Sequence, residues 1–180
     1  MADTLTTIRE RRTIRQYEDR SVPDELLTRV LEAVQWSPSW ANTQCWEVVV
    51  VKDGATKARL QDAVGPTNPA YRALAEAPVV LALCGKLEKA GYYRGISTTK
   101  FGDWFMFDLG IATQSLCLAA HALGLGTVVI GLLDHEKAAK VLNAPAGVEL
   151  AVLIPLGYPA KASAAPRRRA VEEFTHQEVF

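Results

Sequence analysis

The sequence contains two arginine-rich segments whose side chains could bind a phosphate group. The N-terminal segment supplies four guanidinium groups, from Arg9, Arg11, Arg12 and Arg15. The hydroxyl of Thr13 lies among them, and a second cluster at 167–169 is close to the C-terminus. A guanidinium group keeps its charge and can bind phosphate through two parallel hydrogen bonds. The alternatives that need no ligand are a basic turn that faces water and a mobile basic tail.

Between these clusters, amide and hydroxyl groups alternate with tryptophan rings. The segment reads Pro38-Ser39-Trp40-Ala41-Asn42-Thr43-Gln44-Cys45-Trp46. Amide donors and acceptors suit the polar edge of a flat heterocycle, and the rings offer apolar faces. A simple loop between a helix and a strand would explain Pro38 and Trp46, but not the run of Ser, Asn and Gln. Together with the arginines, the segment indicates a phosphorylated, planar cofactor.

The elements that position these groups follow from periodicity and from helix-end signals. We expect helices over 4–11, from Pro23 to before Pro38, and over 54–64, 70–76, 103–123 and 134–142. We expect strands over 47–51, 79–84, 127–130 and 148–156. Residues 85–102 lack a clear period and form the longest irregular segment, which in a compact domain is often functional. On pattern alone, this order of elements also allows a doubly wound α/β fold.

Five motifs in this order resemble the nitroreductase family of flavin mononucleotide (FMN) enzymes. They are 11–15, 38–46, Asp108-Leu109-Gly110-Ile111-Ala112-Thr113-Gln114-Ser115-Leu116, Ala122-Leu123-Gly124-Leu125-Gly126-Thr127 and Leu156-Gly157-Tyr158-Pro159. The resemblance implies an α+β fold: one domain over 1–180, with a mostly antiparallel central sheet flanked by helices. It also implies a homodimer in which the arm 157–180 is exchanged. Apolar residues spaced along the arm (Val171, Phe174, Val179 and Phe180) agree with docking on a partner.

The same resemblance assigns residues to the cofactor. FMN is expected to contact Arg11, Arg12, Thr13, Arg15, Pro38, Ser39, Asn42, Gln44, Val129, Ile130, Gly131, Arg167 and Arg168. Pro38, Ser39 and Asn42 would reach the flavin that is bound mainly by the other subunit. The backbone of 129–131 would pass along the flavin ring, although a strand and its turn also explain that segment. The family usually places a basic residue of this region against the FMN phosphate. Its usual proline just beyond corresponds to Ala170, which leaves the register open by one residue; Arg168 is preferred and Arg167 is second.

Some positions depart from the family pattern and bear on the substrate. Trp40 replaces a residue that is usually small, so we expect it to narrow the pocket or to stack on the substrate. Tyr93, from the irregular segment, is expected to form another pocket wall. Cys45 replaces a common proline and is interpreted as structural, because no base is recognisable nearby. Gly131 removes a polar contact that larger relatives often supply with an acidic residue.

The resemblance implies a ping-pong oxidoreductase that passes electrons from NADH or NADPH to a nitroaromatic, quinone or related small-molecule acceptor. The flavin carries the chemistry, so no catalytic side chain is assigned. Two alternatives remain open. One is a flavoenzyme of the same fold with another reaction, such as substrate oxidation or reductive dehalogenation. The other is a non-catalytic flavin-binding dimer.

Composition and charge exclude several other classes. Twenty Lys and Arg balance twenty Asp and Glu, which argues against a nucleic-acid partner. The apolar stretch 104–125 contains Asp108, Gln114 and His121, so it is predicted to be a core helix and not a membrane span. Three cysteines without metal-ligand spacing predict reduced thiols and no metal site. With no apolar signal segment in 1–10, we expect a cytoplasmic protein.

Overall fold

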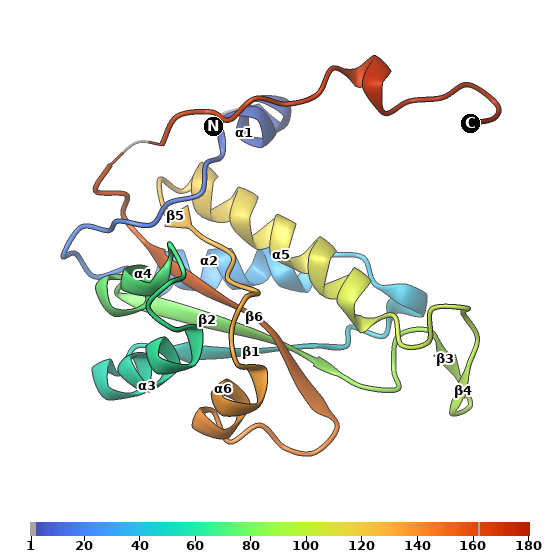
Figure 1. Cartoon of the computed structure of the whole chain (residues 1–180), viewed down its shortest axis with the longest axis horizontal. Helices are drawn as coiled ribbons and strands as arrows, with labels where there is room; N and C mark the ends of the chain where they lie inside the picture. The colour runs from blue at the N-terminus through green and yellow to red at the C-terminus, as the bar shows by residue number, and fades with distance from the viewer. Residues whose placement is uncertain (1–2, 162) are drawn as a thin grey trace.

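The computed structural model describes residues 3–161 and 163–180. Positions 1, 2 and 162 lie outside the described residues, and with them part of the segments 1–10 and 157–180 considered above. The central sheet contains β1 (Trp46–Val51), β2 (Val79–Lys86), β5 (Gly126–Thr127) and β6 (Val148–Gly157), in the order β1-β2-β6-β5 (Figure 1). All three neighbouring pairs are antiparallel, which confirms the α+β prediction and excludes the doubly wound alternative.

Helices cover both faces of this sheet (Figure 1). They are α1 (Thr4–Glu10), α2 (Asp24–Gln35), α3 (Gly54–Val64), α4 (Tyr71–Glu76), α5 (Phe105–Ala122) and α6 (His135–Val141). Strand β2 is buried on both sides, and its side chains alternate between two cores. Leu81 and Leu83 pack with α2 and α5, whereas Val80 and Ala82 pack with α3, α4 and α6. The sheet is therefore the middle layer of three.

The helix ends follow local chemistry. The Asp53 carboxylate accepts the Thr56 N–H at 2.7 Å and caps α3, and Asp134 accepts the Lys137 N–H at 2.9 Å and caps α6. Gly124 follows α5 with φ of +77°, a conformation that glycine adopts without strain. Within the described part of the chain, no helix has the length and apolar character needed to span a bilayer.

Two predicted segments differ from the structure. The strand predicted over 127–130 is β5 alone, followed by an isolated bridge between Ile130 and Leu153. In the segment predicted to be irregular, β2 continues to Lys86, and a hairpin follows from β3 (Tyr92–Tyr93) and β4 (Ile96–Ser97). Its two-residue turn has φ of 52° at Arg94 and 77° at Gly95. Two positive values are typical of a turn that matches the twist of a hairpin.

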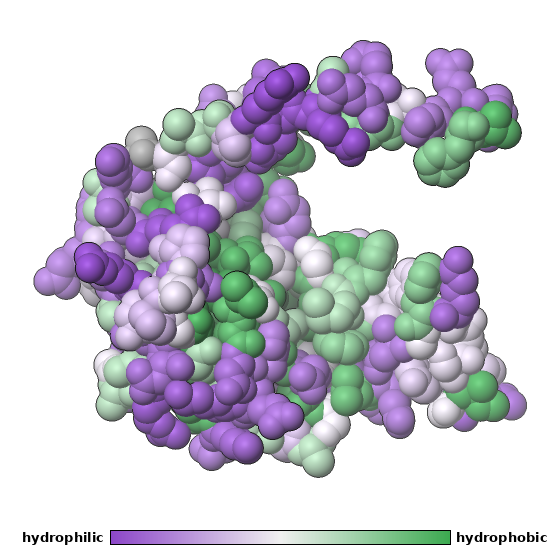
Figure 2. All heavy atoms as spheres, viewed as in Figure 1, coloured by the Kyte–Doolittle hydropathy of each residue, from purple (hydrophilic) through white to green (hydrophobic). Residues whose placement is uncertain are grey.

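The C-terminal arm extends away from the three layers. After β6 the chain passes α1 and continues beyond it, with one short 3₁₀ turn at Val171–Glu173 (Figure 1). Figure 2 shows the arm overhanging a face of the body that is rich in apolar side chains. The arm's own apolar residues Val171, Phe174, Val179 and Phe180 are at least half exposed. The arm thus buries little of its apolar surface within its own chain.

Candidate active site

The arginine-rich N-terminal segment is held against the short strand β5. The Ile14 N–H donates to the Thr127 carbonyl oxygen at 2.9 Å, and Thr13 pairs with Thr127 in parallel. Gly126 permits this approach, because a Cβ there would lie 2.5 Å from Ile14 Cγ1. Ile14 is buried, so alternation directs the side chains of its neighbours Thr13 and Arg15 away from the core.

The outward side chains line a hollow of about 240 Å³ beside α5. Its walls are Arg11, Thr13, Arg15, Gly110, Thr113, Gln114, Cys117, Thr127, Val128 and Val129. A second hollow, of about 450 Å³, shares Arg11, Cys117 and Thr127 with the first. Ligand pockets usually measure roughly 300–1,000 Å³, so the two together have the size of a cofactor site. The structure thus brings Arg11, Thr13, Arg15 and Val129 together, as expected from the sequence.

The guanidinium groups of this segment are not equally available. Arg12 Nη1 donates to the carbonyl oxygens of Arg9 at 2.7 Å and Arg11 at 2.9 Å. Among the described residues, the ion pairs join Lys52 to Asp24 and Lys86 to Glu47, so Arg11 and Arg15 have no carboxylate partner. Two unpaired guanidinium groups beside a hydroxyl fit a phosphate that carries nearly two negative charges.

The tryptophan-containing loop is held in a strained conformation. Three non-glycine residues have positive φ: Ala41 at 45°, Asn42 at 56° and Gln44 at 47°. Such residues cost on the order of 1–3 kcal/mol each and occur where the surroundings enforce them. The Ser39 hydroxyl accepts the Gln44 N–H at 3.0 Å, and Gln44 Nε2 donates to Asn42 Oδ1 at 3.2 Å. Both amide side chains are exposed, so the loop presents polar groups outward.

A buried carboxylate lies beneath this loop. Asp108, in the first turn of α5, accepts the Trp40 N–H with Oδ1 and Oδ2, each at 3.1 Å. Cys45 Sγ lies 3.7 Å from Asp108 Oδ2. Burial, followed by the nearby Asp108 charge, raises the pKa of the Cys45 thiol to about 12. The sequence indicated no group beside Cys45, but the structure places a carboxylate there, and its effect is to keep the thiol protonated.

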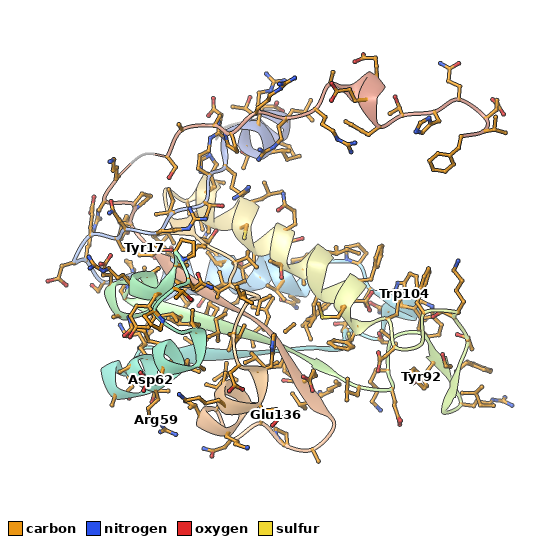
Figure 3. All side chains as sticks on the ribbon, in the orientation of Figure 1. Tyr17, Arg59, Asp62, Tyr92, Trp104 and Glu136 are labelled. Carbon is orange, nitrogen blue, oxygen red and sulfur yellow. The ribbon has the colours of Figure 1, made fainter. Side chains whose placement is uncertain are left out.

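The other predicted residues do not join the arginine hollow within one chain. Arg167 and Arg168 lie on the exposed arm, where Arg168 Nη1 contacts only backbone oxygens of the arm itself at 3.4 Å. Tyr93 is 61% exposed in the β3–β4 hairpin. Figure 3 shows its neighbour Tyr92, with Trp104, at the opposite end of the molecule from Tyr17, which follows the arginine segment.

The segment 129–131 is only partly available to a ligand. The Ile130 N–H and carbonyl oxygen both pair with Leu153, at 2.9 and 3.0 Å, and its side chain is buried. Val129 and Gly131 are exposed on either side of it. A ligand beside this strip would therefore meet Val129 and Gly131, while the polar groups of Ile130 are already used in the sheet.

The comparison with known proteins matches this arrangement to a family. The sequence profile of the nitroreductase family matches residues 8–158 of the chain. The chain belongs to the nitroreductase family. Its fold agrees, because the solved structure of NfrA2 from B. megaterium superimposes with a TM-score of 0.85 at 27% identity. That match covers 100% of this chain and 76% of NfrA2.

Two curated relatives of the chain have names that describe oxidoreductases. "NADH dehydrogenase" of Thermus thermophilus is 31% identical over 185 residues, covering 88% of each chain. "FMN reductase [NAD(P)H]" of Bacillus subtilis is 29% identical over 194 residues, covering 100% of this chain and 75% of the relative. The similarity to these relatives, like the match to the family profile, thus extends over most of the chain.

Sequence reasoning missed several residues that line this nitroreductase-family site. Thr113, Gln114 and Cys117 of α5 line the arginine hollow, and His121 lines the adjoining one. A third hollow, of about 510 Å³, shares Arg15 and adds Asn68 and Arg72, among others. A signal existed for some of them. Asp108, Gln114 and His121 interrupt a mostly apolar helix, and each lies at a hollow or at the strained loop.

Proposed function

We propose that this protein is an FMN-dependent oxidoreductase that transfers electrons from NADH or NADPH to a nitroaromatic, quinone or related acceptor in a ping-pong cycle. The observation that carries the proposal is the hollow that Arg11, Thr13 and Arg15 line together with Val129. Its unpaired cations suit a phosphate, and its apolar wall suits a flat ring. The names of the relatives support the same choice of cofactor and donor.

The chain's own groups bind and position the reactants. Arg11 and Arg15 neutralise the phosphate, and the Thr13 hydroxyl adds a hydrogen bond. Val129, with the backbone that continues to Gly131, would hold the flavin ring, and Gln114 would offer an amide, since Val129 and Gln114 line the same hollow. FMN, when bound, supplies the redox chemistry. No side chain is assigned as a general acid or base, and the buried Cys45 stays a neutral thiol below its raised pKa of about 12.

A homodimer completes this proposed site. The face of α5 that carries Met106 and Phe107, both more than half exposed, borders an open apolar hollow of about 580 Å³. A second copy of the chain would cover this face, and its exchanged arm would bury Val171 and Phe174. The partner would then bring its own strained loop and its own Arg167 and Arg168 toward the flavin. This arrangement explains why one chain does not gather all the predicted residues.

An anaerobic titration with NADH, followed by the visible spectrum of the purified protein, tests the function. We expect a yellow flavin band that bleaches in proportion to the donor added and returns when a quinone is supplied. A protein that neither purifies with FMN nor binds it when added would contradict the cofactor assignment. A yellow protein that neither NADH nor NADPH bleaches would contradict the reductase.

A further inference from the structure

Asp108 is the only carboxylate among the buried residues of the described chain, with 1% of its surface exposed. Burying a carboxylate away from water is costly unless hydrogen bonds compensate it. No described cation forms an ion pair with it. Neighbouring positions of α5 are apolar, as expected for a core helix, so packing alone does not account for an acid here. Its hydrogen-bond partners indicate what it does.

Both groups that Asp108 contacts belong to the strained loop. The Trp40 N–H reaches both carboxylate oxygens at 3.1 Å, and Cys45 Sγ lies 3.7 Å from Oδ2. Trp40 and Cys45 flank the residues with left-handed backbone, at 41, 42 and 44. One carboxylate therefore fastens the two ends of a strained turn to the start of α5. Figure 1 shows this connection between α2 and β1 beside that end of the helix.

Strain of this kind persists only where the surroundings enforce it. Inside the loop, the Gln44 N–H donates to the Ser39 hydroxyl at 3.0 Å. Two backbone hydrogen bonds, Asn42 N–H to the Ser39 oxygen at 3.1 Å and Thr43 N–H to the Trp40 oxygen at 2.9 Å, close a short 3₁₀ turn. These bonds hold the turn together, but none of them joins it to α5, as the Asp108 carboxylate does. Glycine is absent from 38–46, and of the three residues in the left-handed region only Asn42 is of a type that adopts it readily. Without a fixed anchor, the backbone at 41–44 would relax toward ordinary values, and the exposed amides of Asn42 and Gln44 would change position.

We propose that Asp108 is a positioning residue, which holds the loop 40–45 in the strained shape that presents Asn42 and Gln44 to the flavin site of the dimer. This inference rests on the proposed function only for the identity of the ligand as FMN. The restraint on the loop follows from the contacts of Asp108 alone. A role in proton transfer does not fit, since both oxygens are buried and are directed at the Trp40 N–H and the Cys45 thiol.

The test compares Asp108→Asn with Asp103→Asn. Asp103 is a matched control, because its carboxylate also binds backbone N–H groups near the start of α5, those of Glu88 and Phe105, but not the loop. In the apoprotein, hydrogen exchange at Trp40 and Gln44 should accelerate in Asp108→Asn alone. We expect its Kd for FMN to rise about tenfold, equivalent to about 1.4 kcal/mol, while the dimer and the far-ultraviolet circular dichroism are retained.

A second substitution separates positioning from general damage. Glycine at position 41 adopts φ of 45° without strain. Adding Ala41→Gly to Asp108→Asn should therefore restore part of the FMN affinity, which a merely destabilised fold would not do. If Asp108→Asn does not fold, Cys45→Ala, which removes one of the two loop contacts, should still accelerate exchange at Trp40 and raise the Kd by about threefold.

Unchanged loop exchange and an unchanged Kd for FMN in Asp108→Asn would overturn the proposal, as would equal effects in Asp103→Asn. The two hypotheses fail in different ways. If the wild-type protein binds no FMN, the proposed function is wrong, whereas the exchange measurement on the apoprotein still decides whether Asp108 restrains the loop.

Discussion

Arg11 and Arg12 are neighbours in the sequence, but their guanidinium groups are not equally available to a ligand. Arg12 Nη1 is bound to the carbonyl oxygens of Arg9 and Arg11, and Arg12 lines only the larger hollow, whereas Arg11 lines both hollows beside α5. The resemblance implied that Arg11 approaches the cofactor with Arg12 close by, but the sequence left open which arginine makes the bidentate contact. At the scale of single residues, availability follows from hydrogen bonds that the spacing of the arginines does not reveal.

This difference predicts that Arg11→Ala yields a folded protein that purifies with little FMN, because a charged hydrogen bond to phosphate contributes roughly 1.5–3 kcal/mol. Arg12→Ala is the control, and it should retain most of the flavin. The ratio of flavin absorbance to protein absorbance measures both. Full flavin occupancy in Arg11→Ala would show that the phosphate lies elsewhere.

The three cysteines are predicted to be unreactive in the folded protein. Burial raises the pKa of Cys84 to about 11, of Cys45 to about 12, and that of Cys117 above its usual value. A raised thiol pKa stabilises the fold at pH values below the unfolded pKa of about 8.5. That contribution is lost as pH rises toward 11–12. Alkylation at pH 8 should thus be slow until denaturant is added. The midpoint temperature of thermal unfolding should decrease as the pH is raised above about 9. Rapid alkylation of the native protein would contradict this burial.

At the scale of elements, the contact between the N-terminal segment and β5 positions the arginines. Gly126 makes this contact possible, since any larger residue would collide with Ile14. The long helix was predicted to end just before Gly124, and α5 ends there. The role of Gly126 depends instead on a segment more than a hundred residues away, which no local signal specifies.

Gly126→Ala is therefore predicted to displace the segment 11–15 and to lower both stability and FMN affinity. The clash lies in a packed core, where overpacking costs about 1–3 kcal/mol. Gly54→Ala is the control, because a Cβ there meets nothing within 4 Å. Thermal unfolding and flavin content should both fall for Gly126→Ala only. A Gly126→Ala protein as stable as the control would mean that Ile14 moves aside without cost.

The predicted helices and strands agree closely with the structure where the signal is local. Helix α3 begins at Gly54 as expected, and Asp134 caps α6 as expected, because a helix start needs only a side chain and the next turn of backbone. The β3–β4 hairpin was not predicted. Its turn uses Arg94 and Gly95, and only the second of these is a common turn signal. The strand predicted over 127–130 extends beyond β5, because a β-branched run does not show where its pairing partner ends.

At the scale of the whole molecule, one chain leaves a large apolar surface uncovered. Met106 and Phe107 on α5 and four residues on the arm are all at least half exposed. Exposed apolar patches of this kind commonly mark an interface. The proposed exchange of arms would bury both surfaces together and would bring polar groups from two chains to each flavin.

Phe107→Asp is predicted to shift the protein from dimer to monomer and to reduce its flavin content, because a charge would have to be buried at the interface. Lys140→Asp, at an exposed position of α6, is the control. Light scattering coupled to gel filtration measures the mass of each variant. A Phe107→Asp dimer that retains full flavin would show that this face of α5 lies outside the interface.

The sequence by itself determined the family, the order of the main helices and strands, and the residues Arg11, Thr13, Arg15 and Val129 of the arginine hollow. These follow from motifs and periodicities that act over a few positions. The tertiary structure decided which arginines are free, that Asp108 reaches Trp40 at a separation of 68 residues, and that Ile130 is used within the sheet. The physical reason is the range of the interactions. Caps and turns are complete within one or two turns of chain, whereas long-range partners exist only after the sheet has been packed.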